Sequence, residues 1–110
     1  MTTQTRSQRF AQRAYQQIRA RKPNDEYSSF ARSFPSLIHM CGLAQAIAFA
    51  KAKKKNDYVK DLAEVLSTQA ETLEKDSREQ PVAVYIRLSR NALEAAGWLK
   101  RYVEAMKEDT

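Results

Sequence analysis

The segment Tyr27–Lys53, with the sequence YSSFARSFPSLIHMCGLAQAIAFAKAK, decides the fold of this chain. From Leu37 to Phe49 its apolar residues cover almost every face of a helix, which is typical of the central helix of a bundle. Pro35 is suited to the first turn of this helix because the missing amide hydrogen is harmless there. Lysines follow at the far end, where they complement the helix dipole. We therefore expect a buried helix over residues 35–54.

Helical spacing continues on both sides of this segment. Phe10, Ala14 and Ile18 recur at intervals of four and form one apolar stripe, and a short apolar pattern precedes Pro35. From Tyr85 to Met106 the apolar residues alternate spacings of three and four, which indicates a seam that faces either the bundle or a docked partner. The predicted helices span residues 5–21, 25–33, 35–54, 57–75 and 81–107.

Length and composition agree with a small helical protein. The 110 residues suit one domain over residues 1–110, large enough for one hydrophobic core. Two glycines and three prolines are few, which argues against sandwiches, barrels and disorder. We expect an all-α fold, a compact bundle of about five helices with a long C-terminal helix.

The sequence also predicts a cytoplasmic setting. Cys41 is the only cysteine, so no intramolecular disulfide can form and a reducing compartment fits best. The start, MTTQTRSQRF, lacks the apolar core of a secretory signal. The longest apolar stretch, residues 37–50, contains two polar residues and is shorter than the ~20 residues that a membrane span needs. We expect no membrane contact.

Candidate catalytic residues are few. His39 is the only histidine, so neither a two-histidine metal motif nor a histidine pair for acid and base roles can form. His39 and Cys41 would point about 200° apart on one helix, which predicts a helix-face histidine and a buried free thiol. Asp57, Asp61 and Glu64 lack the loop of a calcium site, and their positions are explained by the charge preference of a helix N-terminus. We expect no enzyme activity, no metal and no cofactor.

Positive charge is concentrated in the first half of the chain. Residues 1–56 hold eleven basic and two acidic residues, a net charge of +9, whereas the remainder sums to −3. This asymmetry favours a polyanion on one surface and a different partner on another. A solvated surface that keeps the protein soluble is the alternative explanation.

The arginines of the first predicted helix form an organised group. Arg6, Arg9 and Arg13 lie on one strip beside the apolar stripe, with their heads expected in solvent. Arginine suits forked contacts with phosphate, which favours polyanion binding. Tyr15, Tyr27 and Phe30 fall on apolar stripes, so we expect them in the core and expect little base stacking.

The central segment resembles the signature of the small subunit of type III-B CRISPR effectors, the Cmr complexes. That signature runs from an aromatic residue through Ala-Arg and Pro-Ser-Leu-Ile to Gly-Leu-x-Gln-Ala-x-Ala-Phe. The matching residues are Phe30, Ala31, Arg32, Pro35, Ser36, Leu37, Ile38, Gly42, Leu43, Gln45, Ala46, Ala48 and Phe49. A second match lies in residues 92–106, where Ala-Leu-Glu precedes Trp98. Cys41 before Gly42 and Gly97 before Trp98 depart from the pattern.

The resemblance implies a noncatalytic subunit of an RNA-guided effector ribonucleoprotein in antiviral defence. Its expected partners are the guide RNA and target RNA, the backbone subunits, neighbouring small subunits and other Cmr subunits. Such a subunit would contact the backbone of the RNA duplex. The acidic half of the chain could then meet basic neighbours.

Charge, helix geometry and the matched motif together select the candidate RNA-binding residues. These are Arg6, Arg9, Arg13, Arg32, Lys51, Lys53, Lys54 and Lys55. Two alternatives stay open: a helical adaptor that binds only protein through the last helix and the acidic half, and an enzyme that uses His39 and Cys41.

Overall fold

The computed structural model describes residues 3–108, and these residues contain helices and no strand. The all-α expectation is therefore confirmed, with one helix more than the approximate number expected. The helices are α1 (Arg6–Arg21), α2 (Asp25–Cys41), α3 (Leu43–Ala52), α4 (Asn56–Val65), α5 (Ala70–Glu79) and α6 (Val82–Glu108).

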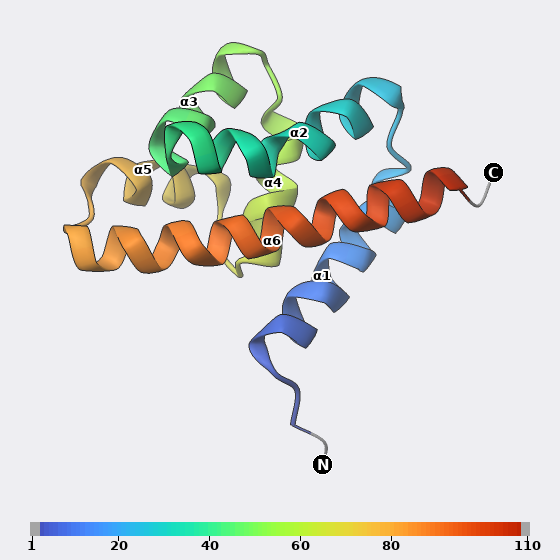
Figure 1. Cartoon of the computed structure of the whole chain (residues 1–110), viewed down its shortest axis with the longest axis horizontal. Helices are drawn as coiled ribbons and strands as arrows, with labels where there is room; N and C mark the ends of the chain where they lie inside the picture. Colours follow the sequence, from blue (N-terminus) through green and yellow to red (C-terminus); the bar gives the residue numbers. More distant parts are fainter. Residues whose placement is uncertain (1–2, 109–110) are drawn as a thin grey trace.

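The long helix α6 organises the molecule. It runs across the full width of the fold, with α2 beside it in the opposite direction and α1 crossing its C-terminal half (Figure 1). Its residues Ala92, Ala95, Leu99 and Val103 are fully buried or nearly so. The seam predicted on this helix is therefore a seam of the bundle itself.

Helix α2 passes through Pro35, contrary to the prediction that one helix ends and another begins there. Pro35 cannot donate the hydrogen bond that would reach Ala31, which normally breaks a helix. The helix continues because Ala31, Phe34 and Ile38 form one buried stripe on both sides of the proline. Tertiary packing thus overrides the local signal.

The chain instead turns at Gly42, which separates α2 from α3. Gly42 has φ 86° and ψ 160°, a conformation open almost only to glycine. Its amide donates to the Ile38 carbonyl, and the Tyr85 hydroxyl on α6 accepts a hydrogen bond from the amide of Ala44. The turn is therefore fixed from the side of α6.

The helix predicted over residues 57–75 is also divided, because α4 ends in a Schellman motif. Ser67 is left-handed with φ 62°, its amide donates to Glu64, and the Thr68 amide donates to Ala63. No glycine marks this end, so sequence spacing could not locate it. The turn lets α4 and α5 pack against each other.

A buried carboxylate joins α1, α2 and α4. Asp61 is 2% exposed and accepts hydrogen bonds from Arg21 at 2.9 and 2.8 Å and from the Tyr27 hydroxyl at 2.5 Å. Burial and the bond to Asp61 raise the pKa of Tyr27 above its usual range, so its hydroxyl stays a donor. Asp61 was expected as a helix-terminal charge, and that expectation is wrong because the side chain points into the bundle.

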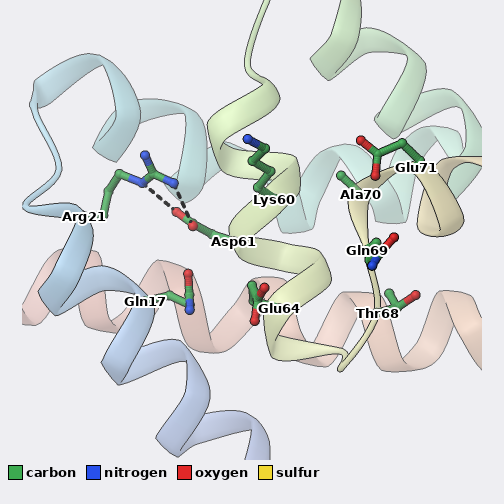
Figure 2. Close-up of a pocket in the computed structure, with 9 residues that line it drawn as sticks. All are labelled: Gln17, Arg21, Lys60, Asp61, Glu64, Thr68, Gln69, Ala70 and Glu71. Atoms are coloured by element: carbon green, nitrogen blue, oxygen red, sulfur yellow. Dashed lines mark hydrogen bonds and ion pairs between the residues drawn. The ribbon is translucent and has the colours of Figure 1, made fainter.

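The ion pair of Arg21 and Asp61 lies at the edge of an open pocket of about 530 Å³ (Figure 2). Lys60 and Glu64 come from α4, and Glu71 comes from α5. Figure 2 shows the forked contact of Arg21 with Asp61 at one side of these residues. The lining has both signs of charge and gives no preference for an anion or a cation.

The two glycines offer a matched test of the turn. Gly42→Ala should lower the free energy of unfolding by about 2 kcal/mol, because the backbone conformation excludes a Cβ atom. The added atom would also lie 3.3 Å from the Tyr85 hydroxyl. Gly97→Ala in α6 should instead stabilise by about 0.8 kcal/mol, since its Cβ meets nothing within 4 Å. Chemical denaturation measures both, and equal effects would contradict the assignment of the turn.

The buried carboxylate generates a second prediction. Asp61→Asn should lower the free energy of unfolding by about 2 kcal/mol, because the buried amide keeps only one acceptor oxygen for the charge-assisted bonds that Arg21 and the Tyr27 hydroxyl donate to the carboxylate. Glu64→Gln, an exposed carboxylate one turn further along α4, is the control and should change stability by no more than about 0.5 kcal/mol. A stability of Asp61→Asn within the range of this control would show that the ion pair contributes little.

Candidate nucleic-acid interface

The predicted basic residues fall into two separate regions. Arg6, Arg9 and Arg13 lie on the N-terminal half of α1, at the bottom of Figure 1. Lys51 and Lys53–Lys55 lie at the end of α3 and the turn after it, at the top of the same view. The molecule measures 43 × 41 × 22 Å, so the two regions lie at opposite ends of a flattened body. The fold therefore keeps them apart.

The three arginines line a groove of about 390 Å³, here called the arginine groove. Thr5 begins α1 with a capping box in which its side chain and that of Gln8 each bond the other's backbone amide. This cap fixes the first turn of the helix and the positions of its arginines. The other lining residues are Phe10, Leu66, Ser67, Thr68, Leu73, Asp76, Leu88 and Asn91.

The arginines of the groove differ in what they contact. Arg6 is exposed and lies 3.4 Å from Glu94, a distance that makes a weak surface pair. Arg9 is exposed and donates to the Gln4 carbonyl at 2.9 Å. Arg13 is half-buried and donates to the Val65 carbonyl at 3.3 Å, so the expectation that its head is in solvent is only partly met. Arg6 and Arg9 are the more accessible cations.

The lysines follow α3 in a second Schellman motif, here called the lysine turn. Lys54 is left-handed with φ 59° and donates its amide to Lys51, and the Lys55 amide donates to Ala50. This turn displays three consecutive lysines around the end of the helix. Their charge complements the negative end of the helix dipole.

Two of the four lysines already form ion pairs with carboxylates. Lys51 contacts Glu74 at 2.6 Å, and its hydrogen bond lowers the pKa of Glu74. Lys55 pairs with Glu26, likewise lowers the pKa of that carboxyl, and has a side chain only 17% exposed. Lys53 and Lys54 are exposed and make no ion pair among the residues that the structure describes. They are the accessible cations of the lysine turn.

Arg32 lies on α2, apart from the arginines of α1. It is half-buried, and within residues 3–106 its guanidinium makes neither an ion pair nor a hydrogen bond. Its position in the matched motif is therefore not explained by a structural contact.

Exposed aromatic rings are the feature that sequence periodicity missed. Phe49 is 42% exposed and Tyr15 is 41% exposed, so placing both in the core was wrong. Tyr15 packs its edge on Tyr102 and accepts a hydrogen bond from Arg19 instead. Tyr27 is buried as expected, and Phe30 is partly buried. The uniform apolar character of α3 hid which of its faces points outward.

His39 and Cys41 lie in the last turn of α2, where both are exposed. A buried thiol was expected, and the difference arises because the helix ends at Gly42 instead of continuing through it. In the part of the chain with described side chains, no three His, Cys, Asp or Glu residues are placed to hold a metal ion. No described helix is both long and apolar enough to cross a membrane.

Comparison with known proteins gives a consistent result. A family model described as a CRISPR-associated protein, Cas_Cmr5, matches residues 6–106. The CRISPR system Cmr subunit Cmr5 of Thermus thermophilus is 37% identical over 112 residues, which cover 96% of this chain and 98% of the relative.

A solved structure agrees with this match. The crystal structure of a CRISPR-associated Cmr5 family protein, also from Thermus thermophilus, has a TM-score of 0.87 and 35% sequence identity, over 94% of this chain and 97% of that chain. The resemblance carried by residues 27–53 and 92–106 is thereby confirmed. Because the family model spans most of the sequence and the fold is shared, this chain belongs to the Cmr5 family of CRISPR-associated proteins.

Proposed function

We propose that this protein is a noncatalytic, cytoplasmic subunit of a type III-B Cmr effector ribonucleoprotein and contacts the backbone of the guide–target RNA duplex. The observation that carries the proposal is the arginine groove, in which Arg6, Arg9 and Arg13 from one helix face line a single depression. Membership of the Cmr5 family supports the assembly.

The groove suits phosphate better than it suits a base. Arg6 and Arg9 are exposed, and their present partners are a distant carboxylate and one carbonyl, so a phosphate can replace both at low cost. The rest of the lining mixes apolar side chains with Ser67, Thr68, Asp76 and Asn91, so the arginines are the only cations among the described residues of the groove. Contacts of this kind position an RNA without reading its sequence, which guide pairing would supply.

A second surface supports packing on other subunits. Val82, Val84 and Ile86 at the start of α6 are 74%, 38% and 46% exposed. They lie on one helix at the far side of the molecule from the C-terminal half of α1 (Figure 1). Val82 and Ile86 are four residues apart and share one face of the helix, whereas Val84 points about 200° away from Val82. Exposed apolar residues on a shared face favour a protein contact, so this end would meet a backbone subunit or a neighbouring small subunit.

The adaptor that binds only protein is the alternative function. The seam of α6 proposed for it is buried within the bundle, which leaves the acidic half of the chain and the exposed start of α6 as its support. The two functions differ in one property: only the effector subunit should bind RNA with an affinity that weakens as salt increases.

Purification of the tagged protein from its native host tests the assembly. We expect several larger proteins and short guide RNAs to accompany it, identified by mass spectrometry and sequencing. Protein partners without RNA would favour the adaptor.

A pair of double variants tests the groove. Arg6→Gln with Arg9→Gln should weaken binding to single-stranded RNA and flatten the slope of log K against log salt by about 1.4, or 0.7 for each lost phosphate contact. Arg13 is left intact because its bond to Val65 supports the fold. Binding is measured by fluorescence anisotropy at several salt concentrations, with helicity checked by circular dichroism.

Arg19→Gln with Lys22→Gln is the charge-matched control. Both residues are exposed at the other end of α1, about 20 Å from Arg6 by the helical rise, and their loss changes net charge equally. We expect a smaller loss of affinity and a slope nearer the wild-type value. Equal losses in the two double variants would remove the groove from the RNA face.

A further inference from the structure

We propose that Phe49 and Phe30 form a stacking site for an unpaired RNA base, flanked by the lysine turn, which supplies the adjoining phosphate contacts. The inference rests on the proposed function and deepens it, because it adds a contact with a base at the end of the molecule opposite the arginine groove.

The two rings are arranged as parallel planes. Their planes differ by 3° and their centroids lie 6.4 Å apart, so a base that stacks on Phe49 also lies parallel to Phe30. Both rings line an open pocket of about 500 Å³ between α2 and the end of α3. Phe49 is 42% exposed, which leaves part of its surface free for a ligand.

The site is held rigidly from behind. The Phe30 ring packs edge-to-face with that of the fully buried Tyr58, with 5.3 Å between the ring centroids, and its centroid lies 5.6 Å from that of Phe34. Phe49 lies in the last turns of α3, just before the Schellman motif fixes the chain direction. A base would therefore meet rings that are already ordered, which limits the entropy lost on binding.

Cations border both rings. The Lys53 ammonium lies 5.7 Å from the Phe49 centroid, and that of Lys55 lies 6.0 Å from the Phe30 centroid. Glu26 offsets the charge of Lys55, whereas Lys53 and the neighbouring Lys54 keep theirs. Aromatic rings beside ammonium groups are a combination that holds single-stranded nucleic acid.

The same surroundings argue against a protein partner at this pocket. The cores of protein interfaces are depleted in lysine, yet lysines flank both rings here. Glu26, Ser29 and Ser33 complete the lining, and the Ser33 hydroxyl donates to the Phe30 carbonyl. Such hydroxyls tolerate any base edge, so the site should accept bases without sequence preference.

The test compares two RNA backbones with equal numbers of phosphates: a short oligouridine and an abasic oligonucleotide of the same length. Wild type should bind the oligouridine about tenfold more tightly, the gain expected of one base–aromatic stack. Phe49→Leu, which keeps apolar bulk but removes the ring, should bring this ratio close to one. The slope of log K against log salt should be the same for Phe49→Leu as for wild type.

Two further variants serve as controls. Phe49→Trp retains a ring and should retain the ratio, while Met40→Ala removes an exposed apolar side chain from outside the pocket and should leave it unchanged. Thermal melting verifies that each variant is folded.

The outcomes separate this site from the proposed function. Salt-dependent binding with equal affinity for the two oligonucleotides, or a ratio that survives in Phe49→Leu, would overturn the stacking site and leave the backbone contacts intact. Failure of wild type to bind either one would overturn both. Normal binding ratios together with loss of co-purifying Cmr subunits in Phe49→Leu would identify the pocket as a protein contact and overturn the stacking site.

Discussion

The bond network of Asp61 is the constraint on which the arrangement of the helices depends. One carboxylate, placed on α4, holds Arg21 at the end of α1 and Tyr27 in the first turns of α2. The short connection between α1 and α2 is thereby fixed at both of its ends. Because Asp61 is buried and the Arg21 side chain is 34% exposed, the carboxylate is the member that needs the pair.

With these helices fixed, the ends of the remaining elements determine what reaches the surface. Gly42 redirects the chain into α3, and the Schellman motif at Lys54 then displays the lysines. The similar motif at Ser67 brings the α4–α5 connection to the wall of the arginine groove. The more accessible candidate contacts thus lie near the start of α1 and in the turn after α3, whereas Arg13 and Arg32 lie in the middles of their helices and are half-buried.

The sequence was sufficient to predict the helical class, the stripe of Phe10, Ala14 and Ile18, and the long final helix. It was not sufficient for the break points. Pro35 indicates a helix boundary, but tertiary packing continues the helix through it. Ser67 adopts a left-handed conformation that its residue type does not predict. These are effects of tertiary context, which no short window contains.

The candidate site was predictable only as a set of charges. Periodicity located the arginine strip, but it could not show that Arg13 bonds to Val65 or that Glu26 and Glu74 hold two lysines. Nor could it show that Phe49 faces outward, because α3 is apolar on nearly all sides. Which face of such a helix is covered depends on α2, α4 and α5, and α5 comes next to α3 only in the fold.

The left-handed lysine at the end of α3 also bears on the evolution of this surface. A non-glycine residue in that conformation costs about 1 kcal/mol, so glycine at position 54 would give a more stable helix end. It would also remove one of the two lysines of the turn that make no ion pair among the described residues. Selection for stability alone would favour glycine here, and a lysine retained among homologues at this position would therefore be a mark of selection for charge.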